Sequence, residues 1–426
     1  MQNTCTAIVL AGGQGKRLFP LTINHCKPAV PFGGRYRLID IPISNAINSN
    51  IRKIFVIAQY LTAELQHHLH QTYHFDAFNP GSLDMLTPEE KPEGEKLWFE
   101  GTADAIRQCL NTILKDPAEY FLILSGDQLY NIDFTKMLQC AIENDADLTI
   151  AAFPIKEEEA KRMGLLKING GCFLTDFIEK PQDKKTLEAF ALKESFFKKW
   201  QLKQKDDCKY LGSMGIYIFK REALVRLLKE DPREDFGKHL IPTEIKKGKA
   251  VAYLYRGYWE DIGTIHSFYE ANLALTTREY GIDLYNEKNP IFSGNSHLPG
   301  PKIFSTQIEN SLLSEGSIIQ AKTVTNSIIG VRCQIGFNSI ITNSIIMGTH
   351  FYVPPTKLES GLPERFGIGE NCLIKNAIID EHVLIGNNVK LTNKNNLTLY
   401  DGEGIFIRDG ILVVCYGTTI PDNFEL

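Results

Sequence analysis

The last third of the chain carries a six-residue repeat, which very few folds can accommodate. Aliphatic residues recur six positions apart, as Ile329, Ile335 and Ile341 do. Short strands that turn at Gly, Asn and Ser with this period predict a parallel β-helix of hexapeptide repeats. Residues 349–365 interrupt the repeat, and we expect them to leave the coil as a loop. Other members of the pattern are the Asn-Ser-aliphatic-aliphatic units at 310–313, 326–329, 338–341 and 343–346, and the pairs Ile368/Ile374, Ile379/Ile385 and Val383/Val389.

The first two thirds of the chain follow a different pattern. Apolar runs of strand length alternate there with longer amphipathic segments, which predicts an α/β fold with a mostly parallel sheet flanked by helices. Prolines and glycines break the pattern after residue 280. We therefore expect an α/β domain at 1–279, a linker at 280–300 and a β-helix domain at 301–426. Expected strands include 53–58, 121–124, 148–153, 215–219 and 251–255, and expected helices include 103–114 and 221–228.

Composition narrows the class of protein. The chain has 426 residues, of which 43% are hydrophobic, and its formal net charge is −5. No basic domain stands out, so we expect no nucleic-acid partner. No apolar run approaches ~18 residues and no signal-peptide pattern opens the chain, so we expect a soluble cytoplasmic protein without a membrane partner. The nine cysteines form no C-x-x-C pair, which indicates reduced thiols rather than a disulfide framework or a zinc site.

A glycine-rich loop follows the first apolar strand and is the main sign of chemistry. The run 7–10 leads into Gly12, Gly13 and Gly15, and the cations Arg17 and Lys27 follow. Glycine lets backbone N–H groups approach phosphate oxygens, and cations offset the charge of a triphosphate tail. This predicts a nucleoside triphosphate site. A glycine turn with two surface cations is the alternative.

Two familiar phosphate motifs do not fit this loop. A dinucleotide-binding G-x-G-x-x-G turn needs glycine where Leu18 stands. A Walker A loop needs glycine at Leu10 and Ser or Thr at Arg17. The loop therefore points to another class of nucleotide-binding enzyme.

Asp127 is the first candidate carboxylate. It follows the apolar run 121–124 and Gly126, so it falls where a buried strand ends at the ligand edge of a parallel sheet. Aspartate is a hard oxygen ligand that suits Mg²⁺. An aspartate that only forms the turn after glycine is the alternative.

Several of these motifs together resemble the glucose-1-phosphate adenylyltransferase family. The resemblance covers nearly the whole chain, and its motifs come in the same order. It rests on Gly12-Gly13-x-Gly15-x-Arg17-Leu18-x-Pro20-Leu21-Thr22, Lys27-Pro28-Ala29, the run 31–45, and the segments 98–104, 125–130, 179–181, 213–217 and 258–264.

The resemblance implies a Rossmann-like nucleotidyltransferase domain followed by a left-handed parallel β-helix. It implies transfer of the adenylyl group of ATP to glucose 1-phosphate, with Mg²⁺ and no organic cofactor, in a homotetramer. The implied catalytic residues are Arg17, Lys27 and Asp127. Asp261 is implied as the second metal ligand, and we expect its neighbour Glu260 to point away and be solvated.

The resemblance also implies the substrate contacts. Lys180 would hold the phosphate of glucose 1-phosphate and Glu179 would accept hydrogen bonds from the sugar, although by pattern alone the two form an exposed pair before a proline. Phe99 stands where bacterial members often carry tyrosine, so we expect a weaker sugar contact there. The implied nucleotide site is Leu10, Ala11, Gly12, Gly13, Gly15, Gln59, Gly101 and Thr102. The implied sugar-phosphate site is Phe99, Gly164, Glu179, Lys180 and Ser213.

Members of the family are commonly regulated by anions that bind basic side chains between the two domains. This chain retains Arg37 and Arg408 as candidate effector contacts. Other positions depart from the family. Asn24 and His25 stand where bacterial relatives often carry Lys and Arg, and Glu381 and Tyr416 stand where plant relatives carry lysines. Each lost cation removes a charge-assisted hydrogen bond, so we expect weak activation by both effector types.

Three other functions remain open at this point. The enzyme could make UDP-glucose or dTDP-glucose, since residue types do not decide the base. A non-catalytic regulatory subunit could share the fold, although it should have lost residues such as Arg17, Lys27 and Asp127. Many hexapeptide β-helices are acyltransferases with a histidine base, for which His350 and His382 are the candidates. We prefer a structural role for these two residues, as ordinary surface or loop histidines.

Overall fold

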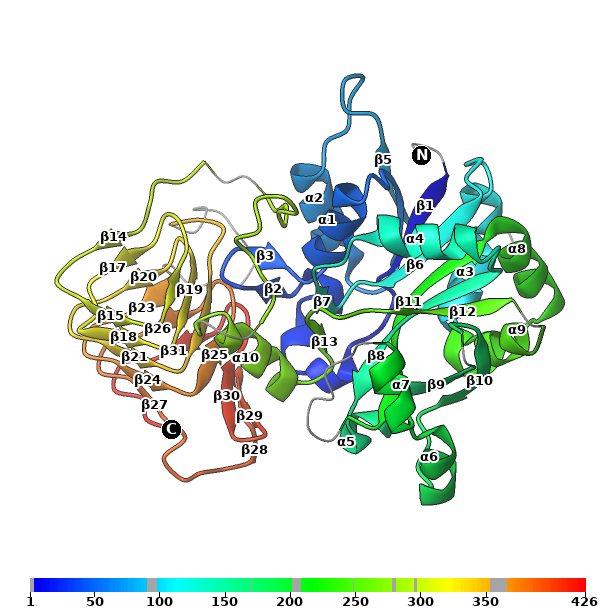
Figure 1. Ribbon diagram of the computed structural model, residues 1–426. Helices are drawn as coiled ribbons and strands as arrows, with labels where there is room; N and C mark the ends of the chain where they lie inside the picture. Colours follow the sequence, from blue (N-terminus) through cyan, green and yellow to red (C-terminus); the bar gives the residue numbers. More distant parts are fainter. Residues whose placement is uncertain are drawn as a thin grey trace.

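The computed structural model describes residues 4–89, 98–169, 171–200, 208–247, 249–277, 281–294, 297–352 and 366–426. It shows an α/β part and a β-helix side by side (Figure 1). The last helix of the α/β part, α10 (Ile265–Ala274), and the first strand of the β-helix, β14 (Lys302–Ile303), fall on either side of the predicted linker. The exact domain limits stay a prediction.

A nine-stranded sheet forms the centre of the α/β part. Its main order is β10-β9-β11-β6-β1-β4-β5, and β8 pairs with β11 and β12. The pairs β6/β1, β1/β4 and β4/β5 are parallel, whereas β11 runs antiparallel to its neighbours. The predicted strands and helices are confirmed. The strands are β1 (Cys5–Leu10), β4 (Lys53–Ile57), β5 (Ser82–Leu86), β6 (Tyr120–Ser125), β8 (Leu148–Ile155), β9 (Gly164–Ile168), β10 (Leu174–Glu179), β11 (Tyr210–Lys220) and β12 (Ala250–Leu254).

Helices cover both faces of this sheet because its strands are apolar on both sides. Along β1, Ala7 and Val9 face one hydrophobic core and Ile8 faces the other. The helices α1, α2, α4 and α10 pack into the first core, and α3, α8 and α9 pack into the second. The helices are α1 (Asp40–Asn48), α2 (Thr62–Thr72), α3 (Thr102–Ile113), α4 (Phe134–Glu143), α5 (Glu157–Ala160), α6 (Lys184–Phe190), α7 (Glu194–Lys199), α8 (Arg221–Glu230), α9 (Ile241–Lys247) and α10.

The C-terminal part is the predicted parallel β-helix. Each coil stacks its strands in register on the next, so that Ile329 lies over Ile346 and Ile346 lies over Ile379. The aliphatic residues spaced six apart fill the interior, where Ile329 and Ile341 are fully buried. Asparagines with positive φ, such as Asn343 at 46°, turn the chain at the corners, a conformation that asparagine tolerates well.

Three ladders of parallel strands make up this coil, and the third ends in an antiparallel hairpin. Most of the predicted excursion at 349–365 lies outside the described residues. The ladders are β14, β17 (Ile318–Ile319), β20 (Gln334–Ile335), β23 (Gly367–Ile368), β26 (Leu384–Ile385) and β31 (Thr419–Ile420); β15 (Gln307–Glu309), β18 (Thr323–Thr325), β21 (Ile340–Thr342), β24 (Leu373–Lys375) and β27 (Lys390–Leu391); and β16 (Leu312–Leu313), β19 (Ile328–Val331), β22 (Ile345–Gly348), β25 (Ala377–Ile379), β30 (Ile411–Val414), β29 (Ile405–Arg408) and β28 (Leu399–Asp401).

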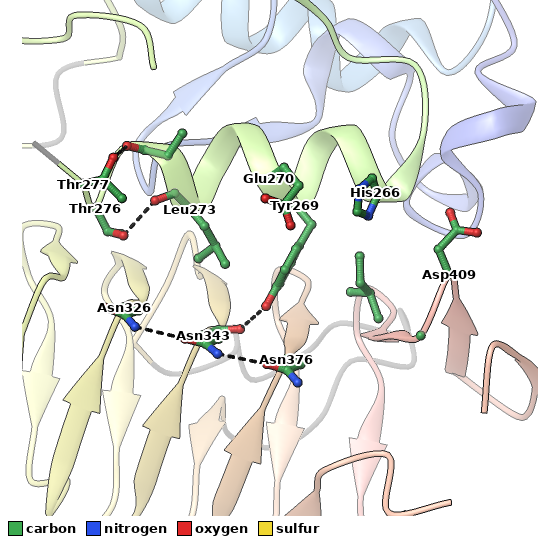
Figure 2. A pocket seen from close by; sticks show the side chains of 13 residues that line it. His266, Tyr269, Glu270, Leu273, Thr276, Thr277, Asn326, Asn343, Asn376 and Asp409 are labelled. Atoms are coloured by element: carbon green, nitrogen blue, oxygen red, sulfur yellow. Dashed lines mark hydrogen bonds between the residues drawn. The ribbon is translucent and has the colours of Figure 1, made fainter. Parts of the chain in front are cut away.

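The two parts share one core rather than touching loosely. Ile328, Ile345 and Val413 of the β-helix belong to the same hydrophobic cluster as α1 and α10. The hydroxyl of Tyr269 on α10 also donates a hydrogen bond to the carbonyl of Asn343, 2.6 Å away, above a ladder of asparagine amides (Figure 2). The β-helix is therefore placed firmly against the α/β part.

The segment predicted as a linker lies along α1. The amide N–H of Phe292 donates to Oγ of Ser44 at 2.8 Å, and Nδ2 of Asn48 donates to the carbonyl of Pro290 at 2.9 Å. Within the residues that the structure describes, no helix combines the length and apolar character needed to cross a membrane.

Candidate active site

A cleft of about 790 Å³ opens at the carboxyl ends of the parallel strands. Leu10, Ile57 and Ser125 line it from the ends of β1, β4 and β6, which is where ligands bind in open α/β sheets. The predicted nucleotide residues all line this cleft: Leu10, Ala11, Gly12, Gly13, Gly15, Gln59, Gly101 and Thr102.

The glycine loop bends tightly over the cleft. Gly15 has a φ of +63°, and a Cβ atom there would lie 2.8 Å from Cγ2 of Thr22 and 3.1 Å from Cβ of Lys27. Only glycine fits both this conformation and this contact. Gly13 has no atom within 4 Å of its Cβ position, so its backbone faces open space where a phosphate could approach.

Lys27 and Asp127 meet at the centre of the cleft. Nζ of Lys27 bonds Oδ2 of Asp127, and the Ser125 hydroxyl donates to the other carboxylate oxygen. Burial by itself would raise the pKa of Asp127, but the charge and hydrogen bond of Lys27 outweigh it and the pKa is lowered. Asp127 is therefore held as a carboxylate.

Asp261 lies beside Asp127 although they are far apart in sequence. A two-stranded antiparallel ribbon, β7 (Gln128–Tyr130) and β13 (Trp259–Asp261), pairs Asp261 with Gln128. The N–H of Ile262 donates to the carbonyl of Asp127 at 3.1 Å. Burial and the negative charge of Asp127 raise the pKa of Asp261, so the ribbon brings two mutually repelling carboxyl groups together.

Arg17 lies next to Asp261, and neither residue is among those that line the cleft. A Cβ atom on Gly263 would lie 3.2 Å from Oδ2 of Asp261 and 3.5 Å from a terminal nitrogen of Arg17. Arg17 itself is exposed, so its guanidinium is accessible to an anion. The structure thus brings together all four charged residues predicted for catalysis and metal binding: Arg17, Lys27, Asp127 and Asp261.

Gln59 connects the two walls of the nucleotide end. Its Nε2 donates to the carbonyls of Gly12 at 3.0 Å and Phe99 at 3.3 Å, and its Oε1 accepts from the N–H of Phe99 at 3.0 Å. Both amide hydrogens are therefore used within the protein. This side chain fixes the shape of the pocket around the glycine loop.

The opposite wall contains a π-helix that the sequence did not predict. This helix, η4 (Phe236–Leu240), follows Asp235, and residues 235–237 line the cleft. Oγ1 of Thr102 accepts a hydrogen bond from the N–H of Phe236 at 3.1 Å. A Cβ on Gly101 would lie 2.4 Å from the carbonyl oxygen of Glu234, so glycine is required for this close approach.

The predicted sugar-phosphate residues divide into two groups. Phe99, Glu179 and Lys180 line the cleft. Gly164 lies behind them, where β9 pairs it with Glu179. Ser213 is 7% exposed and its Oγ accepts from the N–H of Gly215, which does line the cleft.

Further residues line the cleft that sequence reasoning missed. A Cβ on Gly237 would lie 3.1 Å from Oε2 of Glu179 and 3.5 Å from Oδ1 of Asp235, so Asp235 faces the predicted sugar end. Gln128 opens β7, is buried, and donates from Nε2 to the carbonyl of Met214 at 2.9 Å. The missed residues are Gln14, Lys16, Pro28, Tyr60, Glu100, Gln128, Gly215, Tyr217, Asp235, Phe236 and Gly237.

Glu260 differs from the prediction that it would be solvated. It is partly buried, and burial together with the charges of Glu159 and Asp261 raises its pKa to about 7. The reason is that β13 pairs with β7 and holds Glu260 partly against the protein.

The site is suited to handling two phosphate groups. The glycine loop, Lys27 and Asp127 line one cavity, and Asp261 and Arg17 lie beside this pair. Residues 6–278 match the nucleotidyl transferase family. The chain belongs to this family. Residues 296–424 match the GLGC left-handed parallel beta-helix domain, so the coil is left-handed, as predicted.

The two histidines that were candidates for an acyl-transfer base, His350 and His382, make structural contacts in the β-helix. His382 is 1% exposed and packed between aromatic rings of Phe366 and Tyr416, and burial lowers its pKa to about 4. His350 pairs with Glu381 at 3.3 Å. The sequence predicted a surface or loop histidine, but His382 is a buried residue of the β-helix, covered by the rings of Phe351 and Tyr416.

Proposed function

We propose that the protein transfers the adenylyl group of ATP to α-D-glucose 1-phosphate, giving ADP-glucose and diphosphate for glucan synthesis. One observation carries most of this proposal: Lys27 and Asp127 meet in the cleft that contains the glycine loop, and Asp261 and Arg17 lie beside this pair. The choice of adenine and of glucose rests on the resemblance of the sequence motifs to the glucose-1-phosphate adenylyltransferase family.

In the reaction, a phosphate oxygen of the sugar phosphate attacks the α-phosphorus of the triphosphate. The bond from this phosphorus to the bridging oxygen breaks and diphosphate leaves with the electron pair. The attacking oxygen is already an anion, so no protein nucleophile is required. The protein must hold two anions in line and offset the charge of the leaving group.

Arg17 and Lys27 are proposed to offset that charge. The guanidinium of Arg17 offers several parallel N–H donors and suits bidentate binding of diphosphate oxygens. Lys27 acts as a point charge at the centre of the cleft, where Asp127 holds its ammonium in place. Backbone N–H groups of the glycine loop would bind the phosphate tail.

Asp127 and Asp261 fit a divalent cation. Their mutual repulsion, visible in the raised pKa of Asp261, is relieved by a positive charge between them, and carboxylate oxygen is the ligand that Mg²⁺ prefers. Bound there, Mg²⁺ would neutralise phosphate charge. Asp127 and Asp261 would be its protein ligands, and the ammonium of Lys27 would then be available to a substrate phosphate.

The remaining predicted residues have positioning roles in this proposal. Gln59 and Thr102 shape the nucleotide end, where Leu10, Ala11 and Gly12 would contact the base through backbone atoms. Glu179 would accept hydrogen bonds from the sugar hydroxyls and Lys180 would bind the sugar phosphate. The protein is proposed to act in the cytoplasm as a homotetramer, with the β-helix contributing to assembly.

Diphosphate release tests the proposal directly. The purified protein would be given glucose 1-phosphate and Mg²⁺ with ATP, UTP, dTTP, CTP or GTP in turn. ATP is expected to support the fastest release. A preference for UTP or dTTP would assign a different nucleotide sugar, and no release with any triphosphate would leave the regulatory-subunit alternative in its place.

A further inference from the structure

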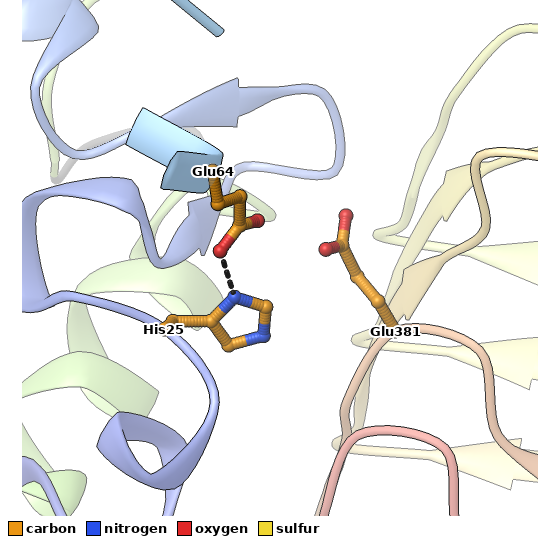
Figure 3. Close-up of side chains that lie close together, drawn as sticks. All are labelled: His25, Glu64 and Glu381. Carbon is orange, nitrogen blue, oxygen red and sulfur yellow. Dashed lines mark hydrogen bonds and ion pairs between the residues drawn. The ribbon is translucent and has the colours of Figure 1, made fainter. Parts of the chain in front are cut away.

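The contact between the two domains is built around a buried histidine. His25 lies between the short helices η2 (Leu21–Ile23) and η3 (Lys27–Ala29), and its side chain is 1% exposed. Its Nδ1 is 2.8 Å from Oε2 of Glu64 on α2, and its Nε2 is 3.0 Å from Oδ1 of Asp380, which follows β25. Figure 3 shows His25 and Glu64 on one side and Glu381 of the β-helix on the other. The imidazole therefore joins the domains.

The geometry requires a charged imidazole. Both ring nitrogens face carboxyl oxygens of Glu64 and Asp380, which as carboxylates accept hydrogen bonds, whereas a neutral imidazole has only one N–H to donate. Burial lowers the pKa of His25, but the charges of Asp380 and Glu64 and their hydrogen bonds outweigh burial and hold it well above the usual value. In a neutral ring, one unprotonated nitrogen would face a carboxylate oxygen, lone pair against lone pair. A protonated ring avoids this.

The other charged groups around His25 do not replace its positive charge. Arg37 reaches Glu64 at 2.8 Å and Glu381 at 3.4 Å, so two cations, His25 and Arg37, face the three carboxylates Glu64, Asp380 and Glu381. The half-exposed His350 pairs with the far oxygen of Glu381, whose negative charge raises the pKa of His350 against the cost of burial.

The remaining titratable neighbours do not change charge between pH 6 and 9. Burial raises the pKa of Cys26 and of Tyr416 to about 12, and it lowers the pKa of His382 to about 4. Near neutral pH the two groups of this cluster that titrate are therefore His25 and His350. His25 is the buried one and the one bonded to both domains.

A metal ion does not suit the same cluster, although ligand atoms of His25, Glu64 and Glu381 lie within 4.8 Å of one another. The guanidinium of Arg37 already pairs with both glutamates, and both nitrogens of His25 are engaged. A further cation would have to displace the arginine. The cluster is a closed ion network.

We propose that protonated His25 is a pH-dependent lock between the nucleotidyl transferase domain and the β-helix. When the imidazole loses its proton, the bond to Asp380 or to Glu64 is lost and the domain contact loosens. Because the histidine is charged in the folded protein above its usual pKa, its stabilisation is complete below about pH 6.5 and disappears as the pH rises through the raised pKa. Loosening is therefore expected on the alkaline side.

The lock is connected to the cleft through a very short segment. Lys27, which bonds Asp127, is two residues after His25 and begins η3. A movement of His25 away from the β-helix changes the start of η3 and with it the position of the ammonium group. The domain contact and the centre of the cleft thus share one piece of backbone.

The protonation state can be measured directly. The protein, labelled with ¹³C at the imidazole carbons of its ten histidines, would be titrated by NMR, and His25→Gln would identify the His25 resonance. We expect a midpoint well above the usual value of about 6.5, and Asp380→Asn is expected to lower it by about one pH unit or more. A midpoint at or below 6.5, or no change in Asp380→Asn, would overturn the proposal.

Hydrogen exchange tests the mechanical consequence. Between pH 7 and pH 9.5, after correction for intrinsic exchange, β25 and residues 380–384 are expected to exchange roughly tenfold faster in the parent protein. His25→Gln is expected to exchange fast at both values. His266→Gln, which changes an exposed histidine on α10, should behave as the parent. Equal protection at both pH values in the parent would refute the lock. Neither readout uses activity, so this outcome is independent of the proposed function.

Discussion

At the scale of single residues, Lys27 and Asp127 neutralise each other's charge inside the cleft. Ser125 donates to the same carboxylate, so Asp127 is oriented by two donors from two segments. Asp127 is hard to replace, because an asparagine at this position would keep the shape of the side chain but lose the negative charge. Asp127 is proposed to act on the substrate, whereas Gln59 shapes the pocket.

Asp127→Asn is expected to lower kcat by ~10³-fold, because Asp127, the proposed metal ligand and the partner of Lys27, loses its charge. Diphosphate release with ATP and glucose 1-phosphate measures this. Asp176→Asn, at an exposed position of β10, is the matched control and should keep the parental rate. Turnover of Asp127→Asn within tenfold of the parent would remove Asp127 from the proposed catalytic role.

Gln59→Leu is expected to raise the KM for ATP by ~10-fold with a smaller effect on the KM for glucose 1-phosphate. The substitution removes three hydrogen bonds that join Gly12 to Phe99, and each such bond contributes on the order of 1 kcal/mol. Initial rates at varied ATP and varied sugar phosphate separate the two constants. An equal change in both would mean that Gln59 only stabilises the fold.

At the scale of elements, the cleft is formed by strand ends, by the glycine loop and by the close approach of Gly101 to the backbone of Glu234. The sequence predicted the strand ends well, because apolar runs followed by Gly or Asp are local signals: β1, β6 and the glycine loop lie where expected. It did not predict η4, because a π-helix has no local pattern of its own. It brought Asp261 to the site only through the family resemblance, since the pairing of β13 with β7 is a contact across 130 residues of sequence.

Two glycine substitutions distinguish the crowded wall of the cleft at Gly101 from the open glycine loop at Gly13. Gly101→Ala is expected to lower the melting temperature by several degrees, because its Cβ would lie 2.4 Å from the carbonyl oxygen of Glu234 and backbone has to move. Gly13→Ala, with no neighbour within 4 Å, should melt as the parent does and bind ATP more weakly. Thermal unfolding and the KM for ATP measure both. A stable Gly101→Ala protein with parental kinetics would contradict this account of the cleft wall.

At the scale of the whole molecule, the β-helix is joined to the α/β part by a shared apolar core and by a closed network of charges. The sequence predicted both folds, but not this network. His25, Arg37, Glu64 and Glu381 come from four segments, and nothing in their local sequence shows that they meet. The positions flagged from the sequence as departures from the family, His25 and Glu381, turn out to be partners in one ion cluster with Arg37.

This network makes strong activation by small anions unfavourable. Arg37 is already paired with Glu64 and Glu381. Arg408 pairs with Asp401 and lies over the ring of Phe19. A phosphate would have to displace these carboxylates and would be repelled by their negative charge. Asn24 contributes no positive charge that would attract it. We therefore expect fructose 1,6-bisphosphate and 3-phosphoglycerate each to change the rate of ADP-glucose formation by much less than tenfold.

Glu381→Gln provides the matched test of this explanation. Without the carboxylate, one side of Arg37 is released and the cavity of about 710 Å³ that Arg37 and Glu381 line between the domains becomes less negative. Rates with and without each anion at pH 7 are then expected to show a larger activation in Glu381→Gln than in the parent. Activation of the parent by tenfold or more would show that the network yields to an anion after all, and equal responses of the two proteins would mean that Glu381 is not what keeps the anion out.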